Sequence, residues 1–476
     1  MFQGRVFHIT LFVLCIVSRC LSSIYYIEDI DSLRFALAAK DFNVAELQPH
    51  FPGYPVYVFL LQGLYLITGS IGFSCAVLGG FSIYLVIAAS LGIWKLFFQS
   101  HSILLATLLF LNPLMWIMST RYMPDIMGLA LVILGAYMLI RTLRESEIKS
   151  TLTLCLIIGL LCGVRLSYVP FFLPALILLW KMPNQIIKMA LVTVAAIAIW
   201  LIPMILDTGW DDLLTSAKRQ TDGHFKEWGG GMTSNDASLF KRFELTFEGI
   251  WADGLGGWWG YRHWLTILLS IAWMAAFSSG CAYVIRKQRW KNLTAQLLLS
   301  SICLYMIWAF LFQNVMYKPR HIMPILPFLT MLALIGFMYL QHSYFRISVI
   351  LISIWLPSAT SVTLVLAWQH CIPSAISQSV QWLNKEDLSQ IVIHTDALKR
   401  NYYSAHAKLK PAEYILEEDY VMMKQAIGEG KTLYSTNRVD SALNLAPAES
   451  KVFYHNPYVN RLWSRFWIHK YTTDEQ

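Results

Sequence analysis

Charged residues are scarce in this sequence. Only 14% of its 476 residues are Asp, Glu, Lys or Arg, whereas 56% are hydrophobic, and the mean hydropathy is +0.50. A water-soluble globular protein needs a polar surface, so this balance excludes that class for most of the chain. The net charge of +8 is spread over short loops and forms no basic stripe, which argues against a nucleic-acid-binding protein.

Several motifs of soluble enzymes are also missing. The sequence has no CxxC pair and no Cys/His cluster with zinc spacing, and seven of its eight cysteines lie in apolar runs, where a thiol behaves as a small hydrophobe. A glycine-rich phosphate loop is absent, so a nucleotide-binding domain is not indicated. No small-residue cleavage site follows the apolar run at 6–24, which we therefore interpret as an uncleaved first span.

Apolar runs of roughly 20 residues recur through the first three quarters of the chain and predict a polytopic membrane protein. Basic clusters, densest at 286–291, orient the spans if Arg5 is cytoplasmic. The pattern predicts a mainly α domain over 1–370 with about eleven transmembrane helices and with external loops at 25–55 and 207–262. In this prediction 152–180 forms two short spans, and the short apolar run 56–68 is juxtamembrane.

The remaining residues, 371–476, predict a small soluble domain on the extracytoplasmic side. Short strand-like runs alternate there with helix-like segments, which is typical of an α/β fold. The predicted strands are 391–394, 432–434, 451–454 and 466–468, and a helix is predicted at 412–427.

Three carboxylates, Glu28, Asp29 and Asp31, follow the first span directly. A carboxylate at a membrane surface can take a proton from an attacking hydroxyl group, as a general base does. The alternative is that these residues cap the short helix at 32–40, where the helix dipole favours negative charge. Asp29 and Asp31 also form a DxD pair, which some glycosyltransferases use with nucleotide sugars, but nothing else in the sequence indicates such a domain.

One stretch and two later segments carry a family resemblance. Asp-Ser-Leu-Arg-Phe at 31–35, followed by Pro-His-Phe-Pro-Gly-Tyr-Pro at 49–55, resembles the first external loop of GT-C membrane glycosyltransferases. The closest branch contains protein O-mannosyltransferases and bacterial family-39-like enzymes, in which an HPPGYP-like motif follows the catalytic aspartate. Phe51 stands where these motifs often have proline. Pro124-Asp125 is similar to the family's second acidic motif, and 318–327 is similar to its late Arg-containing segment. The resemblance covers roughly the first 340 residues.

The resemblance implies roles for the charged residues. Asp31 corresponds to the catalytic base, Asp29 is the second candidate and a substrate contact, and Asp125 orients the acceptor or a metal. Arg320, and after it Lys318, would bind the phosphate of a polyprenyl-phosphate sugar donor, since an arginine offers a planar fork of donors. The alternatives are that Asp125 caps its span and that the two basic residues only reach the headgroups.

Other residues are weaker candidates. His50 is a predicted substrate contact, although a histidine in a Pro-rich bend can also satisfy local backbone groups. His224 and Trp228 lie in the tryptophan-rich external loop, where they could close over a substrate, while tryptophan at a membrane boundary is expected anyway. Arg19 and Arg165 lie inside apolar runs and are functional candidates because intramembrane charge is costly.

The resemblance as a whole implies an inverting glycosyltransferase. It would move a sugar, a mannose-like hexose, from the polyprenyl-phosphate carrier to a hydroxyl of a glycan, lipid or protein acceptor at the extracytoplasmic face, with the bacterial inner membrane as the expected location. A divalent metal, Mg or Mn, stays an open option, with Asp31 and Asp125 as its ligands. The rival hypothesis is a transporter or flippase of lipid-linked saccharides, which predicts inverted halves and ionisable residues near the midplane. A polymerase or ligase for surface glycans differs only in its donor.

Overall fold

The computed structural model describes residues 4–228, 230–232, 237–416 and 419–472. It divides into two compact units. The membrane unit comprises Met1–Ile24 and Leu37–Trp368, and the C-terminal unit comprises Tyr25–Ala36 and Gln369–Gln476. The acidic stretch after the first span groups with the C-terminal residues.

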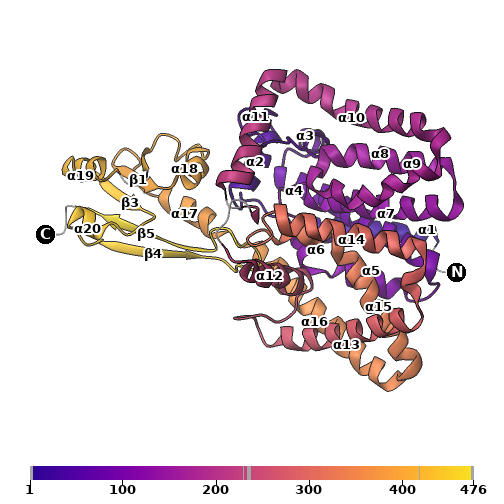
Figure 1. Cartoon of the computed structure of the whole chain (residues 1–476). Helices are drawn as coiled ribbons and strands as arrows, with labels where there is room; N and C mark the ends of the chain where they lie inside the picture. The colour runs from indigo at the N-terminus through magenta and orange to yellow at the C-terminus, as the bar shows by residue number, and fades with distance from the viewer. Residues whose placement is uncertain (1–3, 229, 233–236, 417–418, 473–476) are drawn as a thin grey trace. The chain divides into compact units, whose positions relative to one another are not determined.

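The membrane unit is almost entirely helical (Figure 1). Its elements are α1 (Arg5–Leu21), the end of α2 (Ile30–Ala38), α3 (Pro55–Thr68), α4 (Ile71–Phe97), α5 (Ser102–Phe110), α6 (Pro113–Met118), α7 (Asp125–Glu145), α8 (Ile148–Arg165), η1 (Leu166–Leu176), α9 (Ile177–Lys181), η2 (Pro183–Gln185), α10 (Ile186–Thr208), α11 (Trp210–Asp222), η3 (Gly223–Glu227), α12 (Leu239–Glu248), η5 (Gly249–Gly254), α13 (Leu265–Arg286), η6 (Arg289–Lys291), α14 (Leu293–Phe312), η7 (Pro319–Ile325), α15 (Leu326–Ser343) and most of α16 (Phe345–His370).

Within the described residues, eight helical segments are long and apolar enough to cross a membrane, fewer than the eleven predicted. They are Ile71–Phe97, Asp125–Glu145, Ile148–Lys181, Pro183–Thr208, Leu265–Arg286, Leu293–Phe312, Pro319–Ser343 and Phe345–Leu383. The first predicted span, α1, has only 17 helical residues. The predicted span at 103–118 breaks into α5 and α6, because Pro113 has no N–H to donate and Asn112 caps the new helix instead.

The predicted spans at 152–180 also differ from the structure, because Ile148–Lys181 is one continuous helical run of 34 residues. The chain turns back at Arg165, so the start and the end of this run lie close together. Thr151 near its start donates to the hydroxyl of Thr142 and contacts the sulfur of Met182, just beyond its end, at 3.4 Å. The two short spans predicted here are therefore the two halves of one helical run.

Helices α7, α8 and α10 pack side by side, as Figure 1 shows, and α13 packs along α15. Between α10 and α13 the chain forms α11 and α12 outside the spans. Arg242 anchors α12, since its buried guanidinium donates to backbone carbonyls near the end of α14, including that of Gln313 at 2.6 Å. The opposite side of α12 exposes apolar residues such as Phe240 and Phe243, as in an interfacial helix.

The C-terminal unit contains the predicted α/β fold. Its elements are the first part of α2, the end of α16, α17 (Ala375–Leu383), β1 (Ile391–Thr395), α18 (Ala397–Ser404), β2 (Glu413–Leu416), α19 (Tyr420–Gly428), β3 (Thr432–Ser435), α20 (Asp440–Leu443), β4 (Glu449–Tyr454) and β5 (Arg465–Tyr471). The strands form one sheet in the order β2-β1-β3-β5-β4. Figure 1 labels four of them, β1, β3, β5 and β4.

The sheet is mixed. Strand β1 is fully buried and pairs in parallel with β2 and β3, whereas β5 runs antiparallel to β3 and β4. The helix predicted at 412–427 is wrong in its first part, where β2 forms the sheet edge. Asp419 explains the later start of α19, because its side chain accepts a hydrogen bond from the N–H of Met422 at 3.2 Å and so caps the helix.

Candidate active site

The first candidate group lies in the membrane unit, where α7 begins at Asp125. The Asp125 side chain is fully buried, and its Oδ1 lies 2.9 Å from Arg165 Nη2 and 3.6 Å from Arg320 Nε. Neither carboxylate oxygen accepts a hydrogen bond from a backbone amide within the described residues, so the capping alternative is not supported. Asp125 is instead the anion of a buried charge cluster, formed by Asp125, Arg165 and Arg320.

Arg165 approaches Asp125 because of how α8 ends. Its backbone angles, φ −155° and ψ 80°, leave the helix and turn the chain back on itself. The guanidinium donates through Nη1 to the hydroxyl of Tyr54 at 3.3 Å and lies 5.7 Å from the Tyr168 ring centroid. Gly128 allows this close approach of α7 and α8, since a Cβ there would lie 2.8 Å from the Cβ of Arg165. A larger residue at this position would push the arginine away.

Tyr54 connects the charge cluster to the motif at 49–55. Gly53 has φ +82°, which favours glycine, and Tyr54 itself adopts a left-handed conformation (φ +49°) before Pro55 starts α3. The Tyr54 hydroxyl lies 3.1 Å from His50 Nε2. The motif therefore sets up a chain of polar contacts from His50 through Tyr54 and Arg165 to Asp125.

Arg320 is placed by η7, and a proline explains its surroundings. Pro324 has no N–H, so the carbonyls three and four residues before it, those of His321 and Arg320, lack a usual helical donor. Two buried tyrosines donate instead: Tyr168 to the carbonyl of Arg320 at 2.9 Å, and Tyr305 to that of His321. These bonds hold the backbone of Arg320 while its side chain lies beside Asp125.

The other predicted contacts of the membrane unit are Lys318, His224 and Trp228. Lys318 is half-buried directly before η7. His224, in η3, contacts the backbone carbonyl of Phe312 at the end of α14 through Nε2. Trp228 is 52% exposed and packs against Gly223. The structure thus brings together Asp125, Arg320 and, through two intervening side chains, His50.

The second candidate group is the acidic stretch in the C-terminal unit. Asp29 Oδ1 accepts a hydrogen bond from the N–H of Ser32 at 2.8 Å, and its Oδ2 accepts one from Asn460 Nδ2 at 2.9 Å. Asp29 therefore caps α2, as the capping alternative predicts for this residue. Asp31 lies in the first turn of α2, almost fully buried, with Arg34 Nη1 at 3.8 Å one turn later.

A divalent metal is not favoured at the charge cluster. The described residues contain no group of three or more His, Cys, Asp or Glu side chains that could hold a metal ion. Asp125 already faces two guanidinium groups, which would repel a divalent cation.

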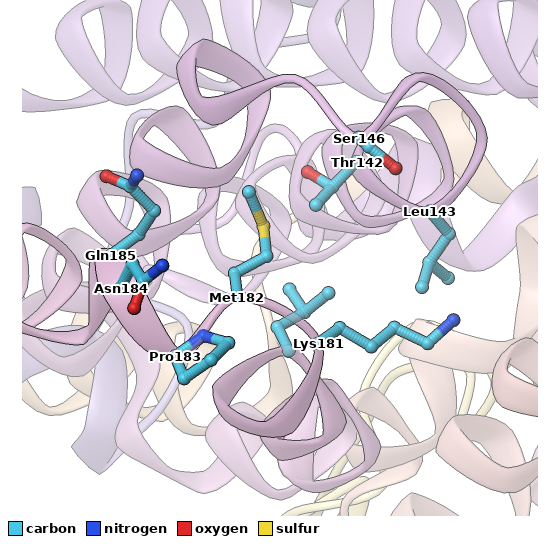
Figure 2. A pocket seen from close by; sticks show the side chains of 9 residues that line it. Thr142, Leu143, Ser146, Lys181, Met182, Pro183, Asn184 and Gln185 are labelled. Carbon is cyan, nitrogen blue, oxygen red and sulfur yellow. The ribbon is translucent and has the colours of Figure 1, made fainter.

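A cavity of about 340 Å³ lies elsewhere in the membrane unit (Figure 2). It is lined by Thr142 and Ser146 at the end of α7 and by the turn around Met182. Asp125 and Thr142 are 17 residues apart on one helix, about 25 Å at the helical rise. This cavity is therefore not part of the charge cluster.

The intramembrane arginine Arg19 has a structural explanation. Its fully buried guanidinium donates to Ser119 Oγ at 3.0 Å and to the carbonyl of Phe110 at 3.2 Å, and it lies 3.8 Å from the Trp116 ring centroid. The Phe110 carbonyl is available because the helix breaks after it. Arg19 therefore joins α1 to α5 and α6.

The sequence analysis does not single out three tyrosines beside the charge cluster, Tyr54, Tyr168 and Tyr305. Tyr54 has a signal, because it lies within the resembling motif. Tyr168 and Tyr305 belong to no motif. They bond the carbonyls of Arg320 and His321, which Pro324 leaves without a helical donor, and this proline is distant from both tyrosines in the chain. Arg165, by contrast, is found by the cost of intramembrane charge alone.

Comparisons with known proteins show the fold. No family model matches the sequence, and no curated protein matches it. Among solved structures, ArnT from Cupriavidus metallidurans bound to undecaprenyl phosphate is similar with a TM-score of 0.55 at 10% identity, over 98% of both chains. The oligosaccharyltransferase of Archaeoglobus fulgidus in its apo form has a TM-score of 0.53 at 12% identity, over 91% of this chain and 70% of its own. The oligosaccharyltransferase AglB from the same organism, solved in complex with an inhibitory peptide and a dolichol-phosphate, has a TM-score of 0.51 at 12% identity, over 92% of this chain and 70% of its own. The chain therefore shares the fold of these structures, which agrees with the fold that the resemblance to GT-C enzymes implies.

Proposed function

We propose that this chain is an integral-membrane glycosyltransferase that uses a polyprenyl-phosphate-linked sugar. The structural neighbours support the donor class, because ArnT was solved with undecaprenyl phosphate and AglB with a dolichol-phosphate. The observation that carries the proposal is the charge cluster, in which Arg320 is buried beside Asp125 at the start of a span. Charged side chains within membrane spans are costly and often mark substrate sites, so this group is the proposed place for the donor phosphate.

Arg320 is the proposed ligand of the donor phosphate, with Lys318 second. When the sugar leaves, negative charge develops on the phosphate, and a preorganised guanidinium stabilises it most effectively where water is excluded. Asp125 and the η7 backbone bonds keep Arg320 in place, so that little reorganisation is needed. Asp125 is thus a positioning residue for the leaving-group site.

Asp31 is the proposed general base. It lies in the first turn of α2, where the helix dipole favours the ionised form. The acceptor O–H gives its proton to Asp31 while its oxygen forms a bond to the anomeric carbon. The bond from that carbon to the phosphate oxygen breaks, and polyprenyl phosphate leaves. Attack opposite the leaving group inverts the anomeric configuration.

The finer assignments extend this proposal. We infer a mannose-like hexose, an acceptor hydroxyl on a glycan, lipid or protein, and an active site and C-terminal unit on the extracytoplasmic face of a bacterial inner membrane. His50 is a proposed sugar contact held by Tyr54, and the exposed Trp228 ring offers a stacking face. His224 would position the loop that carries this tryptophan.

The experiment is transfer of labelled sugar from a panel of polyprenyl-phosphate monosaccharides by purified protein in detergent. Asp31→Asn should lower the rate about 10²–10⁴-fold or more, the range expected for losing a general base, while the protein still purifies as a folded species. Asp41→Asn, which neutralises an exposed carboxylate nearby in the chain, is the matched control and should keep the rate. Full activity of Asp31→Asn would refute the assignment of the base. Failure of every donor with folded protein would favour the transporter hypothesis.

A further inference from the structure

The C-terminal unit contains a segment from the other end of the chain. Residues Tyr25–Ala36, here called the acidic segment, group with Gln369–Gln476 and not with the rest of the first loop. Side chains more than 340 positions later in the sequence bond to this segment. The acceptors in the segment are the backbone carbonyls of Ile27 and Glu28 and the side-chain carboxylate of Asp29.

Asn460 makes the contact nearest to Asp31. Its Nδ2 donates to Asp29 Oδ2 at 2.9 Å, while its Oδ1 accepts a hydrogen bond from the N–H of Leu462 at 2.9 Å. This second bond fixes the amide, so that the donor side faces the carboxylate. His455 holds the backbone of Asn460 in turn, because its Nε2 bonds the Asn460 carbonyl at 2.8 Å while its Nδ1 accepts from the N–H of Ala375.

Further bonds hold the residues just before Asp29. Ser374 Oγ donates to the carbonyl of Glu28 at 2.8 Å, and the Tyr402 hydroxyl donates to the carbonyl of Ile27. Burial raises the pKa of Tyr402 well above its usual value, so this hydroxyl stays protonated as a donor. The buried Glu28 carboxylate lies 3.2 Å from His370 Nε2. Three consecutive residues, Ile27, Glu28 and Asp29, are therefore fixed from the C-terminal part of the chain.

We propose that the C-terminal unit positions the general base. Asp29 caps α2, and Asp31 lies two residues later in the first turn of the same helix, so whatever fixes Asp29 also fixes the direction of Asp31. Asn460, Ser374 and Tyr402 are positioning residues in this proposal, which rests on the proposed function. A displacement of about 1 Å at a reacting group can cost about 10²-fold in rate.

These contacts are separate from the core of the unit. The hydrophobic core between the sheet and α19 consists of other residues, including Val392, Ile415 and Leu433. Loss of a positioning bond should therefore loosen the acidic segment and leave the sheet intact. This separation makes the proposal testable with the full-length protein.

The test compares Asn460→Ala, Asn460→Asp and the control Lys431→Gln in detergent. The ammonium group of Lys431 bonds the exposed carboxylates of Glu413, at 2.8 Å, and Glu429, which lie outside the acidic segment. We expect amide hydrogen exchange of 25–36 to speed up in Asn460→Ala while β1 and β3 stay protected. We also expect kcat to fall about 10- to 100-fold with KM for the donor changed less than about threefold, since the donor phosphate site is untouched. Lys431→Gln should match wild type in both readouts.

Asn460→Asp distinguishes positioning from simple packing. Aspartate has nearly the shape of asparagine but places an acceptor against the Asp29 carboxylate, so we expect this variant to be worse than Asn460→Ala. Combining it with Asp29→Asn exchanges donor and acceptor, and because asparagine caps helices as well as aspartate does, protection of 25–36 should return. A role in packing alone predicts the opposite order and no recovery.

The outcomes separate this proposal from the proposed function. If wild type transfers no sugar, the proposed function fails, but the exchange data still report whether Asn460 fixes the segment. If wild type transfers sugar and Asn460→Ala keeps both the kcat and the exchange protection of wild type, the positioning role is refuted. Faster exchange with unchanged kcat would also refute it, because the segment would then move without consequence for the base.

Discussion

Neutralising Asp125 tests the buried charge cluster most directly. Asp125→Asn keeps the size of the side chain but removes its charge. Arg165, whose side chain is only 6% exposed, would then face a neutral amide at the position now 2.9 Å away. The predicted result is a less stable protein, because a buried guanidinium would lose its anion.

The expected magnitude follows from the distance and the burial. At an effective dielectric constant of about 20, unit charges 2.9 Å apart attract by roughly 6 kcal/mol. The cost of taking both groups out of water offsets much of this attraction, so the net contribution of the pair to stability is small. Breaking such a pair from one side, however, typically costs about 3–5 kcal/mol. We expect a loss in that range for Asp125→Asn.

The assay is thermal unfolding of detergent-solubilised protein, followed by tryptophan fluorescence at one fixed heating rate, because unfolding of such proteins is often irreversible. Asp125→Asn should lower Tm by several degrees. The matched control is Glu145→Gln at the other end of the same helix, which breaks the exposed pair with Arg141 (2.6 Å) and should leave Tm unchanged.

A double-mutant cycle completes this test. Arg165→Met should also destabilise, and the combination with Asp125→Asn should cost less than the sum of the two single changes, since the arginine is then absent. Equal Tm shifts for Asp125→Asn and Glu145→Gln would refute the buried pair. Strict additivity in the cycle would refute the direct contact between the two residues.

Two further predictions concern residues outside the proposed chemistry. Arg19→Met should lower Tm, because the bonds from Arg19 to Ser119 and to the Phe110 carbonyl are lost and the carbonyl stays buried, at a cost of about 1–3 kcal/mol; unchanged Tm would show that α1 is held by packing alone. Burial lowers the pKa of His406 below its usual value of 6.5, so its neutral form favours folding, and this contribution should be complete above about pH 6.5 and decline as the pH falls below it. Protection of α18 from amide hydrogen exchange should therefore fall more from pH 7.5 to pH 5.5 in wild type than in His406→Gln. An equal fall in both proteins would contradict a lowered pKa of His406.

Much of the fold follows from simple patterns in the sequence. Hydropathy predicts the helical membrane unit, because in lipid every backbone polar group must be bonded within a helix. Alternating short apolar runs predict four of the five strands. The span count differs because hydropathy does not register a helix break: Leu111-Asn112-Pro113 lies inside an apolar run, yet Pro113 ends the ladder of bonds. The edge strand β2 is missed because the sequence at 412–427 is typical of a helix, whereas α19 begins after its cap at Asp419.

The charge cluster is only partly predictable. Asp125 and Arg320 come from motifs, and Arg165 comes from the cost of charge in a membrane. That the two arginines flank one aspartate depends on the turn at the end of α8 and on Gly128, neither of which has a recognisable pattern. The tyrosines that bond the η7 carbonyls depend on the same tertiary arrangement. The sequence therefore points to these three charges as candidates but does not predict which of them are paired.

The acidic segment shows why domain boundaries drawn along the chain can mislead. Composition changes at about residue 370, where spans give way to short strands, and a boundary there is reasonable from sequence alone. The C-terminal unit nevertheless completes its hydrogen bonds with residues from the first loop, since Asn460 and Ser374 find their acceptors at Asp29 and Glu28. An asparagine and a serine in loops carry no signal that such partners exist. A deletion of 371–476 would consequently remove the groups that fix Ile27, Glu28 and Asp29, so loss of transfer in a truncated protein would not show that the C-terminal unit binds substrate. Point substitutions at Asn460 are the perturbation that separates these two explanations.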